Sequence, residues 1–380
     1  MPSKARKTAA QASYQQGERK NFIINGDMAI CQRATSSSSL GAASGYFVQD
    51  RWRIGTSTTG EGRFTMSQDA EAPDGFANSM KIDCTTAEDG PAADEYLLIQ
   101  QRFEGLNLQS LNQGDAQAKA VTVSFWVRSP KTGVHTVTLY KKDDADGNNR
   151  LISSTYTIAS ADTWEYHTCT FAGDTTGAIP DDNSEGFSLW FWLLAGSDRT
   201  SGTLATSWES YTAANTCSSS QVNVLDNTSN NFYLTGVQME LGNTATDFQY
   251  ESFKENLSRC QRYFMAYGPS GTDATDDYVV IGTGLAAGTT ISWIEINPPT
   301  PMRTRPSATF NTVYVFDANN RTLGSITYFS GEDGAVYRPF STVWIRAVNT
   351  GSTTNNTTGR GAQLYLDAAT DSYFWLSAEL

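Results

Sequence analysis

The feature that most constrains the fold of this chain is an alternation of apolar and polar side chains along short segments. Val121, Val123, Phe125 and Val127 share one parity, and Thr, Ser, Trp and Arg stand at the positions that follow them. Because successive side chains of a β-strand point to opposite faces, a period of two indicates a strand with one buried face. Similar runs recur about every 8 to 12 residues through much of the chain, a spacing typical of a β-sandwich.

One run has apolar side chains at both parities. Leu189, Phe191 and Leu193 share one face of the expected strand, and Trp190 and Trp192 share the other. A strand that lacks a polar face has no side suited to open solvent. We therefore expect this strand to be covered on both sides or to line a groove.

Residues 252–264 have helical rather than strand-like periodicity. Phe253, Leu257 and Phe264 recur at intervals of four and seven residues, and the segment opens with the Ser-x-x-Glu pattern of a capping box. The pattern predicts one amphipathic helix. Its apolar face is a candidate for contacts between chains, and the alternative is that it packs within its own chain.

Length and pattern together predict an all-β protein with more than one domain. The 380 residues exceed the roughly 100 to 200 that usually share one core. We predict a jelly-roll β-sandwich over residues 21–250, a helical junction over residues 251–265 and a second, smaller β-sandwich over residues 266–380. Residues 1–20 precede the first expected strand.

Charge is distributed unevenly along the chain. The formal net charge is −13, of which the first twenty residues carry +4 and the rest −17. We predict that residues 1–20 form an attachment arm that docks on a partner, although such a segment is more often a solvated tail. Its basic side chains are Lys4, Arg6, Lys7, Arg19 and Lys20. An acidic body repels the phosphate backbone, so no nucleic-acid partner is expected.

Several classes of protein are disfavoured by what the sequence lacks. No stretch approaches the roughly 18 consecutive apolar residues of a membrane helix, so no membrane insertion is expected. Five well-separated cysteines without a CxxC pair argue against a zinc site and a full set of disulfides, and they indicate free core thiols. These are Cys31, Cys84, Cys169, Cys217 and Cys260.

The sequence predicts no enzyme. The two histidines, His135 and His167, each lie within an alternating strand-like run, and no GxSxG, HExxH or Walker pattern occurs. Carboxylate pairs such as Asp181 with Asp182 leave a glycosidase open on composition alone. A depolymerising enzyme would normally be a long parallel β-helix with regular short repeats, and the chain has no such repeat.

One oxygen-rich turn is a candidate for a structural Ca²⁺ site. Asp143, Asp144 and Asp146 stand together just before Gly147 and Asn148, and carboxylate oxygens are ligands that Ca²⁺ prefers. The spacing does not match an EF-hand loop. A hairpin turn is the favoured interpretation, with no other cofactor expected.

Aromatic residues are the main candidates for ligand binding. The chain has nine tryptophans and seventeen tyrosines, and aromatic rings stack on the C–H faces of sugars while polar groups bind the hydroxyls. Trp126, Tyr140, Trp190 and Trp192 fall on expected strands of the first domain, and we predict that they contact a glycan. The alternative for each of them is a place in the core.

Short strings in the chain resemble a known family. Residues 21–28 read NFIINGDM, residues 31–33 CQR and residues 50–53 DRWR. These strings resemble the opening of the jelly-roll domain in phage tail-fibre and related particle proteins, which is akin to family 4 carbohydrate-binding modules. Residues 234–242 and 255–264 are similar to the junction into the family's C-terminal domain.

The resemblance implies a structural protein of a tailed phage particle, assembled in the host cytoplasm. It also implies a homotrimer. We predict a short fibre or attachment protein that is anchored to other virion proteins through residues 1–20 and binds host surface glycans. Phe253, Leu257 and Phe264 are then the candidate contacts between chains. A capsid decoration or head-fibre protein is the alternative, and a glycan depolymerase is a weaker one.

Overall fold

The computed structural model describes residues 21–57, 60–142, 148–268, 278–287, 291–311, 313–317, 320–330, 343–349, 358–367 and 373–380. The chain divides into two compact units, one that ends at Asn256 and also includes Leu380, and one that runs from Leu257 to Glu379. Each unit consists mainly of antiparallel strands. The prediction of an all-β protein with a β-sandwich is therefore confirmed.

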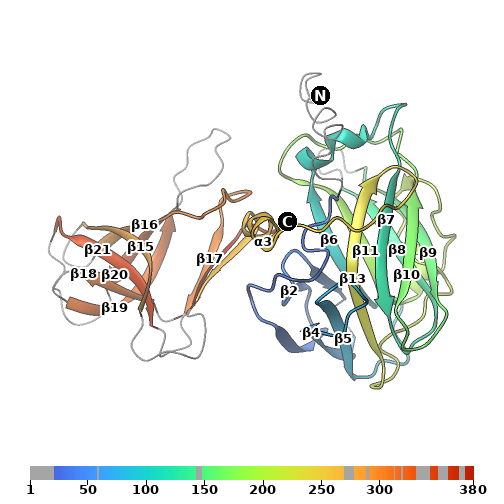
Figure 1. Ribbon diagram of the computed structural model, residues 1–380, viewed down its shortest axis with the longest axis horizontal. Coiled ribbons are helices and arrows are strands. Elements are labelled where there is room, and N and C mark those ends of the chain that lie inside the picture. The colour runs from blue at the N-terminus through green and yellow to red at the C-terminus, as the bar shows by residue number, and fades with distance from the viewer. Residues whose placement is uncertain are drawn as a thin grey trace. The chain divides into compact units, whose positions relative to one another are not determined.

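Two antiparallel sheets form the first unit (Figure 1). Within the described residues, sheet A has the order β1 (Ser36–Leu40), β4 (Arg63–Asp69), β5 (Ser79–Thr86), β13 (Asn231–Leu241), β7 (Val121–Arg128) and β10 (Glu165–Phe171). Sheet B has the order β12 (Glu209–Ser210), β9 (Arg150–Ile158), β8 (Gly133–Lys141), β11 (Glu185–Ala195), β6 (Tyr96–Glu104), β3 (Arg53–Thr56) and β2 (Gly45–Tyr46).

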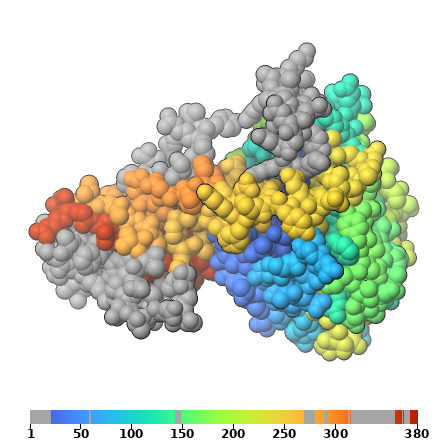
Figure 2. All heavy atoms as spheres, viewed as in Figure 1, coloured from blue at the N-terminus to red at the C-terminus, as the bar shows by residue number. Residues whose placement is uncertain are grey.

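Short helical segments connect some of these strands. They are η1 (Gly105–Leu111), α2 (Ser197–Thr200) and η2 (Ala213–Asn215). The chain that follows β13, coloured yellow, runs along the surface of the first unit before it reaches α3 (Phe253–Gln261) (Figure 2).

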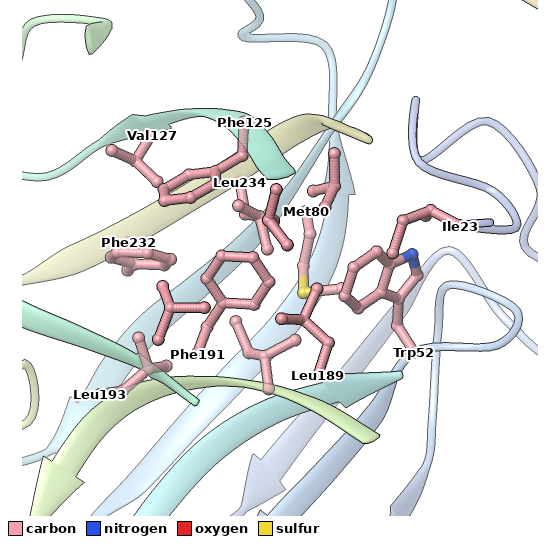
Figure 3. Packing of buried hydrophobic residues seen from close by; sticks show 14 of the residues in the cluster. Ile23, Trp52, Met80, Phe125, Val127, Leu189, Phe191, Leu193, Phe232 and Leu234 are labelled. Carbon is pink, nitrogen blue, oxygen red and sulfur yellow. The ribbon is translucent and has the colours of Figure 1, made fainter. Parts of the chain in front are cut away.

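The core of the first unit lies between the two sheets. Phe125 of β7 and Phe191 of β11 meet edge to face with their ring centroids 5.0 Å apart, and Trp52 lies 6.4 Å from Phe191 (Figure 3). Val127 and Leu189 are fully buried beside them. Phe125 and Val127 have the parity that the alternation assigned to a buried face, so the period of two predicted this part of the core correctly.

The strings that resemble the phage family form one buried network. The side-chain amide of Asn25 donates to the main-chain oxygens of Ile30 and Asp50, and the Trp52 indole donates to the main-chain oxygen of Asn25 at 2.9 Å. The main-chain N–H of Gln32 donates to the Asp50 carboxylate at 3.0 Å. In the described structure these hydrogen bonds hold the first residues of the sandwich together, so the role of these residues is structural.

Helix α3 begins as predicted and ends earlier. The Ser252 hydroxyl donates to the Glu255 carboxylate at 2.9 Å and accepts from the Glu255 main-chain N–H, so the capping box is formed. The helix stops at Gln261, and Phe264 begins strand β14 (Phe264–Tyr267), where it is buried 5.7 Å from the ring of Trp375. The prediction that Phe264 belongs to an apolar helix face is therefore wrong, because tertiary packing draws it into a sheet.

The other two residues of that predicted face differ in exposure. Phe253 is 66 % exposed, and Leu257 is half-buried. The buried positions of the helix are Asn256 and Cys260. The exposed Phe253 remains available for a contact with another chain, which stays a prediction.

In the second unit a closed barrel stands beside a three-stranded sheet. The barrel has the order β15 (Tyr278–Ala286), β16 (Ile291–Ile296), β20 (Val343–Asn349), β19 (Asn320–Ser330), β18 (Val313–Asp317) and β21 (Gly361–Asp367), and the sheet has the order β14, β22 (Tyr373–Ser377) and β17 (Ser307–Asn311).

The barrel is more closed than the open sandwich expected for this unit. A Cβ at Gly284 would lie 1.7 Å from the main-chain oxygen of Trp293, and one at Gly282 would lie 2.7 Å from that of Glu295. Glycine at these positions lets β15 and β16 approach closely, which helps a sheet bend until its edges meet.

Candidate functional site

The four aromatic residues predicted to bind a glycan lie on opposite sides of the first unit. Trp126 is on the outer face of sheet A, because its neighbours in β7 point into the core. Tyr140, Trp190 and Trp192 are on the outer face of sheet B. The structure therefore does not bring the four together in one site.

Trp192 is part of a second, smaller core. It is 2 % exposed, packs with Leu98 and Cys217, and its indole N–H donates to the Thr138 hydroxyl at 2.9 Å. The chain around Cys217 covers this half of the sheet, and Gln221 donates to the main-chain oxygen of Trp192. The expected cover on both faces of β11 is confirmed here. The prediction that Trp192 contacts a ligand is wrong for this structure, because its ring faces protein.

The other half of the outer face of sheet B carries a stacked aromatic pair. The rings of Tyr140 and Trp190 lie 4.7 Å apart at 19°, and both residues are half-buried. Tyr211 meets Tyr140 edge to face at 5.6 Å and is 37 % exposed. The sequence analysis missed Tyr211, because it follows β12, a strand of only two residues that shows no alternation.

Polar side chains from neighbouring strands flank this pair. Arg53 of β3 is paired with Gln100 of β6, and Gln100 is paired with Trp190 of β11. These three side chains share one face, and strands lie roughly 4.8 Å apart, so the arginine stands roughly 10 Å from the tryptophan. The Trp190 indole donates to the Ser188 hydroxyl at 2.7 Å, which holds the ring in place.

Arg53 gives this face a positive charge. Burial lowers the pKa of its guanidinium, and the nearby Arg102 lowers it further. Arg102 donates to the main-chain oxygen of Leu380 at 2.7 Å and lies 3.6 Å from Glu185. Within the described residues the Arg53 side chain makes no hydrogen bond or close ion pair, although the charge of Glu185 acts on it, so its donors can bind an anionic group of a ligand.

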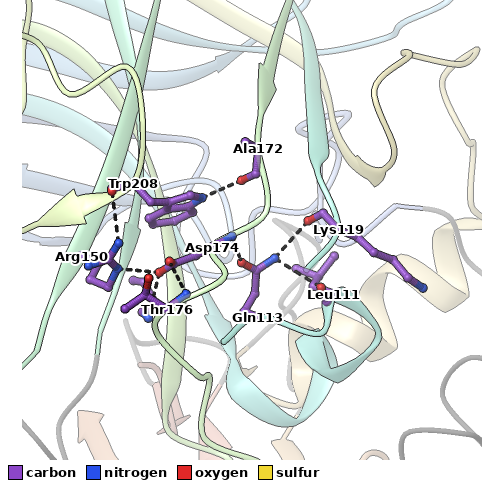
Figure 4. Close-up of polar contacts among 9 residues, drawn as sticks. Leu111, Gln113, Lys119, Arg150, Ala172, Asp174, Thr176 and Trp208 are labelled. Atoms are coloured by element: carbon purple, nitrogen blue, oxygen red, sulfur yellow. Dashed lines mark hydrogen bonds and ion pairs between the residues drawn. The ribbon is translucent and has the colours of Figure 1, made fainter. Parts of the chain in front are cut away.

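A polar network supports the segment that carries Tyr211 (Figure 4). Arg150 donates to the Asp174 carboxylate at 2.7 Å and to the main-chain oxygen of Trp208 at 3.1 Å. The Trp208 indole donates to the main-chain oxygen of Ala172 at 2.6 Å. The segment at the edge of sheet B is thereby fixed against the body of the domain, and Tyr211 is held beside Tyr140.

Two of the predicted sites lie outside the described residues. They are the candidate calcium ligands Asp143, Asp144 and Asp146 and the basic arm at residues 1–20. Across the described ranges, no group of three or more His, Cys, Asp or Glu side chains is arranged to hold a metal ion. No helix in the described part of the chain is long and apolar enough to cross a membrane.

The histidines belong to the interior of the sandwich. His135 is fully buried and stacks on Tyr156 at 5.2 Å and 16°, and the half-buried His167 also lies 5.0 Å from the ring of Tyr156. Burial lowers the pKa of His135 to about 4. Neither imidazole faces an exposed aromatic pair, and the packing of both rings against Tyr156 is a structural role.

Comparison with known proteins gives no family for the chain. No family model matches it, and no curated protein matches it. Among solved structures, it is similar to the enzymatically active domain of tailspike protein 4 of bacteriophage CBA120 at 12 % identity and a TM-score of 0.30, over 58 % of this chain and 21 % of that one. The chain thus spans about a fifth of that tailspike domain.

Two carbohydrate-binding modules have a similar level of likeness. One is a family 4 module, at 14 % identity and a TM-score of 0.29, over 58 % of this chain and 99 % of the module. The other is the family 11 module of Clostridium thermocellum in complex with a β-1,3-1,4-mixed-linked tetrasaccharide, at 12 % identity and a TM-score of 0.27, over 56 % of this chain and 98 % of the module. Likenesses this weak carry no conclusion about function.

Proposed function

We propose that the chain is a structural, non-catalytic protein of a tailed phage particle, a short fibre or attachment protein that binds host surface glycans. In this proposal it is a homotrimer and is anchored to other virion proteins by residues 1–20. The short strings at residues 21–28, 31–33 and 50–53 support the phage context, because they resemble the family opening. The glycan site is supported by the geometry of sheet B.

The observation that carries the proposal is the stacked pair of Tyr140 and Trp190 beside Arg53. Ring faces of this kind bind the C–H surfaces of sugars. The buried Ser188 hydroxyl accepts from the Trp190 indole and donates to the buried Gln100 side chain, so these two residues hold the tryptophan in place. An arginine without a partner in the described structure favours a carboxylate, since the guanidinium binds it through two parallel hydrogen bonds. We therefore propose a glycan with acidic sugars.

Binding to an array of acidic and neutral oligosaccharides tests this proposal. Trp190→Ala should weaken binding of acidic glycans by about tenfold, through loss of stacking. Arg53→Gln should weaken the same interactions by at least as much, because a charge-assisted hydrogen bond contributes roughly 1.5 to 3 kcal/mol. The matched control is Arg63→Gln, which removes a cation from sheet A. Among the described residues, the Arg63 side chain donates only to the main-chain oxygens of Gly60 and Gly62.

Two results would contradict the proposal. One is an array on which the unmodified protein binds no acidic glycan. The other is an Arg53→Gln variant that binds acidic glycans as tightly as the unmodified protein. Melting temperatures are measured in parallel, so that a variant that unfolds is not mistaken for one that has lost a contact.

A further inference from the structure

A groove crosses the outer face of sheet A, on the far side of the sandwich from Tyr140 and Trp190. It has a volume of about 810 Å³. Its floor is formed by β7 and β10, and residues 243–248 form one of its walls. Trp126 lies in it, with the ring of Tyr166 at 5.3 Å and 51°. The groove is thus built around the one predicted aromatic residue that sheet B does not hold.

The floor of the groove changes from aromatic to hydroxyl-bearing along the strands. Trp126 is paired with Tyr166, and the next two pairs on the same face are Ser124 with Thr168 and Thr122 with Thr170. Residues two apart on a strand are roughly 6.8 Å apart, so the three pairs extend over roughly 14 Å. The exposed members of the three pairs are Tyr166, Thr168 and Thr170, so the row offers a sugar chain both a ring face and hydroxyl groups.

Further aromatic rings enlarge the first end of the groove. Phe76 lies 5.0 Å from Phe248 and 5.7 Å from Tyr250, and Tyr250 is 60 % exposed. Gly236 makes room for them, because a Cβ there would lie 2.7 Å from Phe76 and 3.0 Å from Trp126. Its φ of +60° is one that glycine adopts without strain.

Hydrogen bonds to buried side chains of β13 hold the wall of the groove in place. The Thr246 main-chain N–H and hydroxyl donate to the Glu240 carboxylate at 2.7 and 2.8 Å. The main-chain N–H of Gln249 donates to the Gln238 side chain at 2.8 Å. Glu240 and Gln238 are buried in β13. The wall is therefore a fixed part of the sheet, and a ligand would not have to order it.

The charge of the groove selects among glycans. Its charged lining residues are Asp74 and Asp247, and both are exposed. Carboxylates accept hydrogen bonds from sugar hydroxyls and repel acidic sugars. An adjoining hollow of about 690 Å³ shares Thr170 and Asn243 with the groove and adds Lys119, so a longer chain has room to continue.

We propose that this groove is a second glycan-binding site, separate from the site on sheet B, and that it takes neutral oligosaccharides. The two sites lie on opposite sheets and differ in the sign of their charge. Each can therefore bind its own ligand while the other is empty, and neither proposal depends on the other.

Two exposed tyrosines on opposite faces allow a matched test. Tyr166 is 45 % exposed in the groove on sheet A, and Tyr211 is 37 % exposed beside the pair on sheet B. The full-length chain and the variants Tyr166→Ala and Tyr211→Ala are applied to immobilised neutral and acidic oligosaccharides. Tyr166→Ala should weaken binding of neutral sugars by on the order of tenfold and leave acidic sugars unchanged. Tyr211→Ala should leave neutral sugars unchanged.

Three outcomes overturn the second site. They are an unmodified protein that binds no neutral oligosaccharide, a Tyr166→Ala variant that binds neutral sugars normally, and a Tyr211→Ala variant that loses them. Should Tyr166→Ala melt at a lower temperature, Thr168→Val removes an exposed hydroxyl of the same groove with little change in shape. This variant should also bind neutral sugars less tightly, and unchanged binding would overturn the proposal. An unmodified protein that binds no acidic oligosaccharide would contradict only the site proposed on sheet B.

Discussion

His135 makes the stability of the first unit depend on pH. Burial lowers the pKa of its imidazole from 6.5 to about 4, so the folded chain holds it neutral while the unfolded chain protonates it below 6.5. The stability from this site is fully present above pH 6.5 and is lost as the pH falls towards 4. By pH 5 the loss is on the order of 2 kcal/mol. His167, whose pKa is also lowered by burial, acts in the same direction.

Urea unfolding at several pH values measures this dependence. The unmodified chain should unfold at lower urea concentrations at pH 5 than at pH 7.5. His135→Phe keeps an aromatic ring between Tyr156 and Phe232 and removes the titrating group, so its stability should change less over that range. Equal pH dependence of the two chains would show that another group is responsible.

The candidate glycan sites depend on contacts between residues that lie far apart in the sequence. The alternation placed Trp126, Tyr140 and Trp190 correctly on strand faces that point away from the core. It could not separate Trp190 from Trp192, because the chain around Cys217 covers one and not the other. That difference depends on a loop without periodicity, and such a loop leaves no pattern in the sequence.

At the scale of elements, a buried ion pair joins β8 to the loop after β10. The Lys141 ammonium lies 3.1 Å from Asp174, and both side chains are at most 1 % exposed. Burial alone would raise the pKa of Asp174, but the hydrogen bond from Arg150 and the charge of Lys141 lower it. Asp174→Asn should lower the free energy of unfolding by roughly 3 to 5 kcal/mol, because it leaves a buried ammonium without its counter-ion.

A more exposed pair provides the control for this prediction. Lys131 and Asp226 also form an ion pair, but their side chains are 30 % and 28 % exposed. Asp226→Asn should cost no more than about 1 kcal/mol, since water screens the remaining charge. Chemical denaturation of both variants compares the two costs. Similar costs would mean that burial of Lys141 is not what makes its partner necessary.

The elements themselves were more predictable than their arrangement. The capping box placed the start of α3 correctly, because Ser252 and Glu255 interact locally. The helical spacing that continued to Phe264 gave a wrong end for the helix. Phe264 packs against Trp375 instead, and local spacing in the sequence does not show such a tertiary contact. In the same way, alternation indicated strands after residue 278 but could not show that six of the described strands close into a barrel.

For the whole molecule, the arm at residues 1–20 should matter for assembly and not for folding. It carries +4, and the described core of the sandwich begins with Ile23. A chain that lacks these residues should melt at the same temperature and should have, in light scattering, the mass of a trimer of the shortened chain. It should be missing from phage particles assembled in its presence, as seen on a gel.

Incorporation of the shortened chain at the normal level would refute the attachment role. A particle map that shows which protein the arm contacts would further distinguish a tail fibre from a capsid decoration or head-fibre protein. The mass of the shortened chain matters separately, because a monomer would mean that the arm, and not the exposed Phe253 of α3, holds the chains together.

The state of the five cysteines has a practical consequence for chemical labelling. All are free thiols, and all but the half-buried Cys31 are buried. Burial raises the pKa of Cys31 to about 12, of Cys169 to about 11 and of Cys217 to about 12, so almost no thiolate is present at neutral pH. Maleimide dyes react with the thiolate, and the folded protein should therefore stay unlabelled. A single cysteine introduced on either outer face would then carry a dye alone, and its emission could report which face a sugar occupies.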